Sequence, residues 1–216
     1  MIRKILLVQA VAAALLLPLA AGAGPTKTFV MVPKGVHPYY EPCYEGFKAA
    51  AKKYGVTVDK VDPQKFELPL QVKAIEELIA QRVDGIAISA LDDAGLVPVV
   101  AEAAKAGIKV ITFDAPAPSS AALTYIGTDN KTAGFEAGKK MAELMKGKGQ
   151  IVVLQGGLGA ANLNLRTQGF KEALAKVGPG VKGLEGVDVA GDFSGATNQT
   201  EAILQTYPEL TAIFAV

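Results

Sequence analysis

Carboxylate, amide and aromatic side chains stand in this 216-residue sequence at the points where its apolar segments end. Asp114 directly follows the β-branched run 110–113, and Pro116 and Pro118 cannot continue a strand because proline has no N–H to donate. In open parallel sheets, ligands bind at the carboxyl ends of the strands. Asp114 is therefore the residue that this sequence offers most directly to a ligand.

Further polar and aromatic side chains follow other predicted strands. Together with Asp114, the residues that we expect to bind a ligand are Lys34, His37, Tyr39, Tyr40, Asn162 and Asn164. Aromatic rings suit the C–H faces of a sugar, and carboxylates and amides suit its hydroxyls. No nucleophile stands beside a base in this set, so the pattern favours recognition without turnover.

Several of these residues also have a structural interpretation. Tyr39 and Tyr40 could form a hydrophobic staple at the start of a helix. Asp92 or Asp93 fits the N-cap of a helix better than a ligand contact. Asp114 could instead end its strand by capping a neighbouring backbone N–H. The single cysteine, Cys43, cannot form an intramolecular disulfide, and we expect it to be a small buried apolar residue.

The sequence contains few of the residue patterns that enzymes use. One histidine and one cysteine cannot build a His-based metal cluster, and neither a nucleophile elbow nor a phosphate-binding P-loop is present. Gly156-Gly157-Leu158-Gly159 resembles a dinucleotide fingerprint, but Asn162 stands where the third glycine belongs. We therefore expect no catalytic residue, metal or cofactor, and keep a nicotinamide-dependent oxidoreductase as the enzyme alternative.

Strand-like and helix-like segments alternate along the chain, which predicts right-handed βαβ units and parallel sheets. The predicted strands are 28–32, 56–61, 85–89, 110–113, 150–154, 187–190 and 212–216, and a short apolar run at 123–126 follows the fourth of them. The predicted helices cover 42–54, 72–79, 96–103, 132–145, 163–174 and 203–207. Gly134 and Gly138 share one helix face and would allow another helix to approach closely.

The first 23 residues predict a secretory signal peptide, with basic residues, an apolar middle and an A-x-A ending. A membrane anchor is the alternative, because the apolar stretch is almost long enough to span a bilayer. Loss of Arg3 and Lys4 changes the net charge from +1 to −1. Without a basic excess, we expect no binding to nucleic acid.

Six segments occur in the order seen in one known family: GVHPYYEPCYEGFKAAAKKYG, DGIAISALD, ITFDAP, TYIGTDN, VVLQGG and LRTQGF. Over residues 27–216 the chain resembles the periplasmic sugar-binding proteins of ABC transporters, the group similar to ribose-binding protein. The resemblance implies an α/β fold of two Rossmann-like lobes with parallel sheets, the type I periplasmic-binding-protein fold. The lobes would be 24–127 and 128–216, with a first crossing at 127–130. Because the chain ends on an apolar strand, we expect the second lobe to be incomplete.

The resemblance also assigns roles to the residues above. Tyr39 and Tyr40 match paired aromatics that sandwich the sugar ring, and Asp114 matches a carboxylate that accepts two sugar hydroxyls. His37 matches a polar contact in the same loop. Lys34 resembles a ligand lysine of the autoinducer-binding branch.

Two further positions depart from the ribose-binding pattern. Ribose binders carry arginines where this chain has Ala115 and Asn164, which argues against ribose itself. Arg166 looks like the family's second, structural arginine.

The resemblance implies a monomer in the periplasm that carries a sugar to the permease of an ABC importer. Autoinducer- or nucleoside-type binding proteins of the same fold are the alternatives within this class. A sugar-responsive repressor shares the fold but would carry a DNA-binding helix-turn-helix where residues 1–23 stand.

Overall fold

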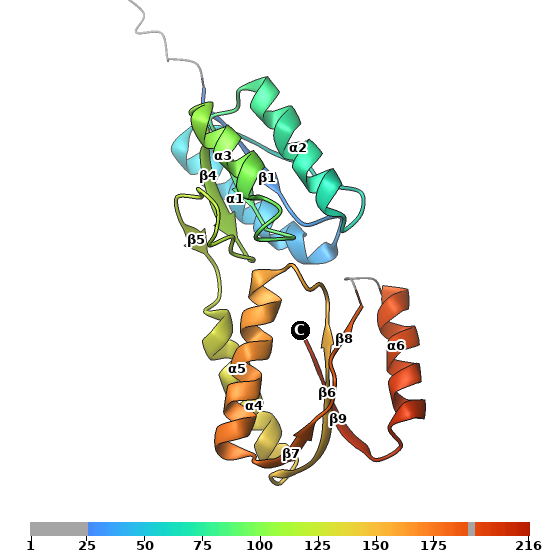
Figure 1. The fold of residues 1–216 in the computed structure, drawn as a ribbon. Coiled ribbons are helices and arrows are strands. Elements are labelled where there is room, and N and C mark those ends of the chain that lie inside the picture. Colours follow the sequence, from blue (N-terminus) through green and yellow to red (C-terminus); the bar gives the residue numbers. More distant parts are fainter. Residues whose placement is uncertain (1–25, 190–192) are drawn as a thin grey trace, which may run out of the picture.

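The computed structural model describes residues 26–189 and 193–216, so the predicted signal peptide lies outside it. It contains two α/β lobes joined end to end (Figure 1). The first lobe holds β1 (Thr28–Val32), η1 (Pro38–Tyr40), α1 (Glu41–Tyr54), β2 (Thr57–Lys60), α2 (Leu68–Gln81), β3 (Gly85–Ile88), α3 (Val97–Lys105), β4 (Lys109–Phe113) and β5 (Tyr125–Ile126). The second holds α4 (Asn130–Leu144), β6 (Lys148–Gln155), α5 (Ala161–Val177), β7 (Gly180–Gly183), β8 (Val187–Asp188), α6 (Phe193–Thr206) and β9 (Leu210–Ala215).

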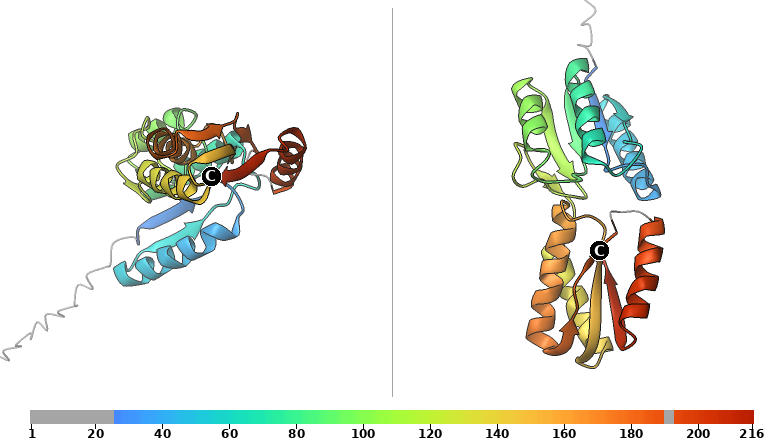
Figure 2. Two further views of the ribbon diagram at one scale, coloured as in Figure 1. Left: turned by 90° about the horizontal axis from the view of Figure 1, so that it is seen from below. Right: turned by 45° about the vertical axis from the view of Figure 1, so that its right-hand side comes forward.

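The first sheet has the order β2-β1-β3-β4-β5, and every neighbouring pair is parallel. Its central strand β3 is buried along its whole length because helices lie on both faces, α2 and α3 on one and α1 on the other (Figures 1 and 2). Val32, Ile75, Ile88 and Val100 are fully buried in the core between the sheet and α2 and α3. This continuous core holds the strand ends that carry Lys34, Ser89 and Asp114.

The second sheet is built around β6. β9 pairs with β6 from Gln150 to Leu154, and β7 and β8 pair with successive parts of the other edge. Helices α4 and α5 cover one face and α6 covers the other (Figure 1). Each face therefore has its own small core, with Phe170 central to one and Ile203 to the other.

The structure confirms the predicted fold class of two α/β lobes with parallel sheets. Strand β7 was not predicted, because its sequence GVKG contains two glycines and a lysine and shows no apolar alternation. The strand predicted at 187–190 is shorter, since β8 ends at Asp188 and residue 190 lies outside the described part.

The chain passes from the first sheet to the second between β5 and α4, where Asp129 caps α4 by accepting the backbone N–H of Thr132 at 3.1 Å. Gly134 then lies against α5, where an added Cβ would stand 2.0 Å from the carbonyl oxygen of Arg166. This close contact confirms the role predicted for Gly134. Among the described residues, no helix is long and apolar enough for a membrane span.

Candidate ligand-binding site

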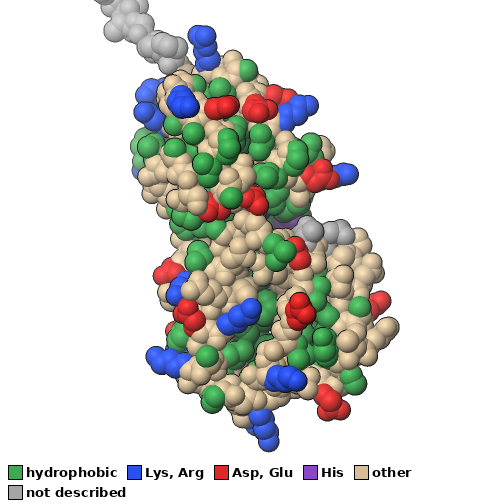
Figure 3. All heavy atoms as spheres, in the orientation of Figure 1, with side chains coloured by type: hydrophobic (Ala, Val, Ile, Leu, Met, Phe, Trp, Pro, Cys, Tyr) green, Lys and Arg blue, Asp and Glu red, His purple; other side chains and the backbone are tan. Residues whose placement is uncertain are grey.

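A cleft of about 340 Å³ lies between the lobes. Figure 3 shows the narrow waist where the two lobes meet. Its lining residues are Lys34, His37, Tyr39, Tyr40, Phe66, Leu91, Asp114, Gly156, Ala160, Asn162, Leu163, Arg166 and Val216. Six of the seven predicted site residues are among them. The mixture of apolar walls and a few convergent polar groups, at a volume suited to a small molecule, is typical of a ligand site.

Asp114 is the centre of the polar network in the cleft. Its Oδ2 accepts hydrogen bonds from Ser89 Oγ at 2.7 Å and from the Tyr40 hydroxyl at 3.3 Å. Among the described residues, its Oδ1 accepts one such bond, from the Tyr39 hydroxyl at 3.2 Å. All three of these partners are hydroxyls, so within the described part of the chain the carboxylate does not cap a backbone N–H, which was the structural alternative. Because Oδ1 has a single donor, it retains a lone pair for a ligand.

The backbone at Asp114 is held in an unusual conformation. Its φ is +58°, a left-handed value that aspartate tolerates better than most residues. Strand β5 fixes this turn, because the Asp114 N–H donates to the Ile126 carbonyl at 3.2 Å and the Tyr125 hydroxyl donates to the Asp114 carbonyl at 2.9 Å. The carboxylate is therefore placed by contacts on both its backbone and its side chain.

The two tyrosines differ in environment. Tyr40 is 4% exposed, whereas Tyr39 is 55% exposed, and their rings meet edge to face at 84° with centroids 5.2 Å apart. Perpendicular rings in contact cannot cover opposite faces of one sugar, so this arrangement is not the sandwich that the resemblance implied. Burial, and secondarily the Asp114 carboxylate, raise the pKa of the Tyr40 hydroxyl, which keeps it neutral and able to donate. Tyr39 is the ring that remains open to a ligand.

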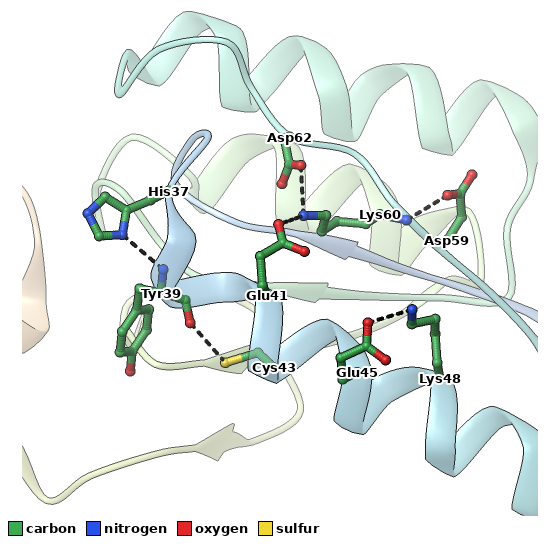
Figure 4. Close-up of polar contacts among 9 residues, drawn as sticks. All are labelled: His37, Tyr39, Glu41, Cys43, Glu45, Lys48, Asp59, Lys60 and Asp62. Atoms are coloured by element: carbon green, nitrogen blue, oxygen red, sulfur yellow. Dashed lines mark hydrogen bonds and ion pairs between the residues drawn. The ribbon is translucent and has the colours of Figure 1, made fainter.

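His37 shapes the loop that carries these tyrosines. Its Nδ1 accepts the backbone N–H of Tyr39 at 3.1 Å and so caps the short helix η1 (Figure 4). Its ring also meets Phe66 edge-on, with centroids 6.3 Å apart. Beside it, Lys60 pairs with Glu41 at 2.6 Å and Asp62 at 3.0 Å, which ties the start of α1 to the end of β2 (Figure 4).

Lys34 and Asn162 connect the two lobes inside the cleft. Lys34 Nζ donates to Asn162 Oδ1 at 3.1 Å, and the two residues are 7% and 3% exposed. Burial lowers the pKa of the Lys34 amine and Arg166 adds to the lowering, while Asp114 opposes it. Lys34 thus presents donor groups from the first lobe to whatever occupies the cleft.

Arg166 presents donor groups from the second lobe. Its Nε donates to Asn130 Oδ1 at 2.8 Å, which fits the structural role that the resemblance implied, and the residue also lines the cleft.

A second contact between the lobes lies at the edge of the cleft. The Asp93 N–H donates to the Gly159 carbonyl at 3.2 Å. An added Cβ at Gly159 would clash with the Asp92 carboxylate, so a larger residue here would have to displace that side chain.

The structure does not bring Asn164 to the cleft: this residue is exposed and donates to the Leu158 carbonyl at 2.8 Å. Two other expectations from the sequence are wrong. The N-cap of α3 is Leu96 rather than Asp92 or Asp93; those carboxylates instead accept from Gly95 and Ser119 in adjoining turns. Cys43 is half-buried rather than buried.

Sequence reasoning also missed part of the site. Phe66 and Leu91 line the cleft although neither follows directly on a strand. Gln71, fully buried on α2, bonds the loops behind the cleft. Its sequence signal was a polar residue in helical register with the buried Ile75 and Leu78.

The cleft is better suited to a polar ligand than the larger hollow of about 430 Å³ beside the passage between the lobes. Asp129 is the charged residue lining that hollow, and its carboxylate already caps α4. Within residues 26–189 and 193–216, no group of three or more His, Cys, Asp or Glu side chains could hold a metal ion.

Comparisons with known proteins agree with this architecture. A family described as periplasmic binding protein domain matches residues 28–216. A solved ABC transporter solute-binding protein from Burkholderia graminis, in complex with D-arabinose, superposes with a TM-score of 0.83 at 38% identity, over 88% of this chain and 65% of that one. A glucose-galactose binding protein from Geobacillus stearothermophilus superposes with a TM-score of 0.84 at 32% identity, over 88% of this chain and 68% of that one.

Among curated proteins, the D-ribose/D-allose-binding protein of Pseudomonas aeruginosa is 26% identical over 180 residues. That match covers 79% of this chain and 56% of the relative, so the chain spans little more than half of that protein's length. Each of these names describes a binding protein.

Proposed function

The chain belongs to the periplasmic binding protein domain family, and on that premise we propose that it binds a monosaccharide or similar small polyol in the cleft between its lobes. The observation that carries the proposal is the Asp114 network at the carboxyl end of β4. It places a carboxylate with spare acceptor capacity beside an exposed aromatic ring, and sugars need both.

We assign the contacts as follows. A sugar hydroxyl donates to Asp114 Oδ1 and can replace the Tyr39 hydroxyl there, in a charge-assisted bond that is stronger than a neutral one. The exposed Tyr39 ring stacks on a C–H face of the sugar. Lys34 and Asn162 bind the remaining oxygens, and His37 and the buried Tyr40 hold the loop in place.

We take residues 24–127 and 128–216 as the two lobes, with the passage at 127–130 as a hinge between them. A ligand that contacts both lobes binds the closed form better than the open form and so shifts the population toward closure. We further propose that the protein acts in the periplasm as a monomer that passes its ligand to an ABC permease. The family and the binding-protein relatives named above support the periplasmic, sugar-binding part of this proposal.

Calorimetric titration of the chain against pentoses, hexoses, polyols and nucleosides tests the proposal. We expect saturable one-to-one binding to at least one sugar or polyol, with nucleosides inert. Binding to nucleosides alone would replace the proposal with the nucleoside alternative, and binding to none of the panel would contradict it.

A further inference from the structure

The buried amide of Gln71 holds three backbone points behind the cleft. Gln71 Nε2 donates to the Pro33 carbonyl at 2.9 Å and to the Ser89 carbonyl at 2.8 Å. Its Oε1 accepts the Leu91 N–H at 3.0 Å. The residue is 0% exposed and does not line the cleft. One side chain therefore satisfies three groups that belong to two different strand-to-helix loops.

These three groups lie beyond the last hydrogen bond between β1 and β3, where the sheet no longer sets the distance between the two loops. The last ladder contact between the two strand ends is the Ser89 N–H donating to the Val32 carbonyl at 3.0 Å. Beyond this bond, the Gln71 side chain links the loop after β1 to the loop after β3. The two amide hydrogens each reach a different loop, so the amide plane fixes the distance between those loops.

Each group that Gln71 holds is next to a residue of the site. Pro33 precedes Lys34, and Leu91 itself lines the cleft. Ser89 donates its hydroxyl to Asp114 Oδ2 at 2.7 Å and contacts the Tyr40 hydroxyl at 3.2 Å. A path of two hydrogen bonds thus runs from the Gln71 amide through Ser89 to the carboxylate at the centre of the site.

We infer that Gln71 is a positioning residue for ligand binding, which sets the place of the Asp114 carboxylate and of Lys34 without touching the ligand. An apolar side chain of similar size would fill the same volume but leave two buried carbonyls unpaired. The two loops would then move until these carbonyls found other donors. Because Ser89 is hydrogen-bonded to Asp114, the Asp114 carboxylate would move as well. The inference rests on the proposed function for its ligand, but the placement of Asp114 can be measured without any ligand.

Gln71→Met tests the inference, because methionine keeps the volume and removes all three hydrogen bonds. The control is Ile75→Val, one turn along the same buried face of α2, which removes one methylene from the core and no hydrogen bond to either loop. The first readout is the ¹³Cγ resonance of Asp114 in the ligand-free protein, and the second is the dissociation constant for the sugar that the wild-type chain binds. Both are recorded on samples whose far-UV circular dichroism shows that they are folded.

We expect Gln71→Met to shift the Asp114 resonance and to weaken sugar binding about ten-fold, the effect of one net hydrogen bond. Ile75→Val should lower the melting temperature and change neither readout. If Gln71→Met does not fold, Gln71→Asn replaces it, since an amide one methylene shorter cannot reach both loops. A folded Gln71 variant with an unmoved Asp114 resonance and wild-type affinity would overturn the inference. A wild-type chain that binds no sugar would defeat the proposed function, while the resonance would still decide the role of Gln71.

Discussion

The two lobes are built from the same alternation of strands and helices but bury their strands to different extents. In the first lobe every residue of β3 is buried, and one continuous core joins the sheet to α2 and α3. In the second lobe neither β7 nor β9 has a buried residue, and the core is divided between the two faces of β6. The first lobe is therefore expected to be the more stable body.

The binding groups follow the same division. The first lobe supplies Asp114 and its three hydroxyl partners, which are held by hydrogen bonds within that lobe, and Lys34, which bonds Asn162 across the cleft. The second lobe supplies Asn162 and Arg166. We therefore extend the proposed function: the first lobe fixes the geometry of recognition, and the second lobe closes over the ligand.

The largest expected effect concerns the cores. Phe170 is fully buried on α5 and stacks on Phe214 with ring centroids 4.0 Å apart. Phe170→Ala should remove ~3–5 kcal/mol of stability from the second lobe, through lost burial and the cavity left behind. Native-state hydrogen exchange should show faster opening in β6 and α5, with β1 to β4 unchanged. Equally faster hydrogen exchange in both lobes would mean that they unfold as one unit, and the expected difference in stability between the lobes would be contradicted.

The next effect separates the two tyrosines. Tyr39→Ala should weaken sugar binding by ~1–3 kcal/mol, the value of burying one aromatic ring, and leave the melting temperature of the free protein nearly unchanged. Tyr40→Ala should lower that melting temperature as well, because Tyr40 is buried and bonded to Ser89 and Asp114. Calorimetry and thermal denaturation of both variants check this. If Tyr39→Ala binds sugar like the wild type, the exposed ring is not part of the site.

The smallest effect is a pH dependence. Because the pKa of Lys34 is lowered in the folded chain from its ordinary 10.5, the cost of burying its charge is fully present at neutral pH. As pH rises toward 10.5, the folded state releases this proton before the unfolded state does, so the wild type should gain stability relative to Lys34→Met. Urea unfolding of both proteins across this range measures the difference. If the difference in unfolding free energy between the two proteins did not change with pH, the amine would be solvated and would not restrain the cleft.

The fold was more predictable from sequence than the site. Strands such as β3, with the sequence GIAI between turn signals, are recognisable because burial on both faces demands continuous apolar residues. β7 has no such burial and gave no signal. Asp114 could be named as a candidate because it directly follows a strand, whereas Gln71 lies inside a helix, where sequence shows only a polar residue on an apolar face. Asn162 lines the cleft and Asn164 does not, because side chains two positions apart on a helix do not share a face.

The measurement that tests the central claim most directly is the sugar affinity of Asp114→Asn, taken together with its melting temperature. Asparagine also tolerates the left-handed backbone at this position, so the variant changes the charge and one acceptor but not the turn. Asp114→Ala, recorded alongside, removes every side-chain bond and should cost ~2–5 kcal/mol of binding free energy, with asparagine intermediate. The account predicts a large loss of affinity in Asp114→Asn with a small fall in melting temperature, since Ser89 and Tyr40 lose part of a shared acceptor. A lowered melting temperature with an unchanged dissociation constant would contradict it and leave Asp114 as a residue that only holds its loop.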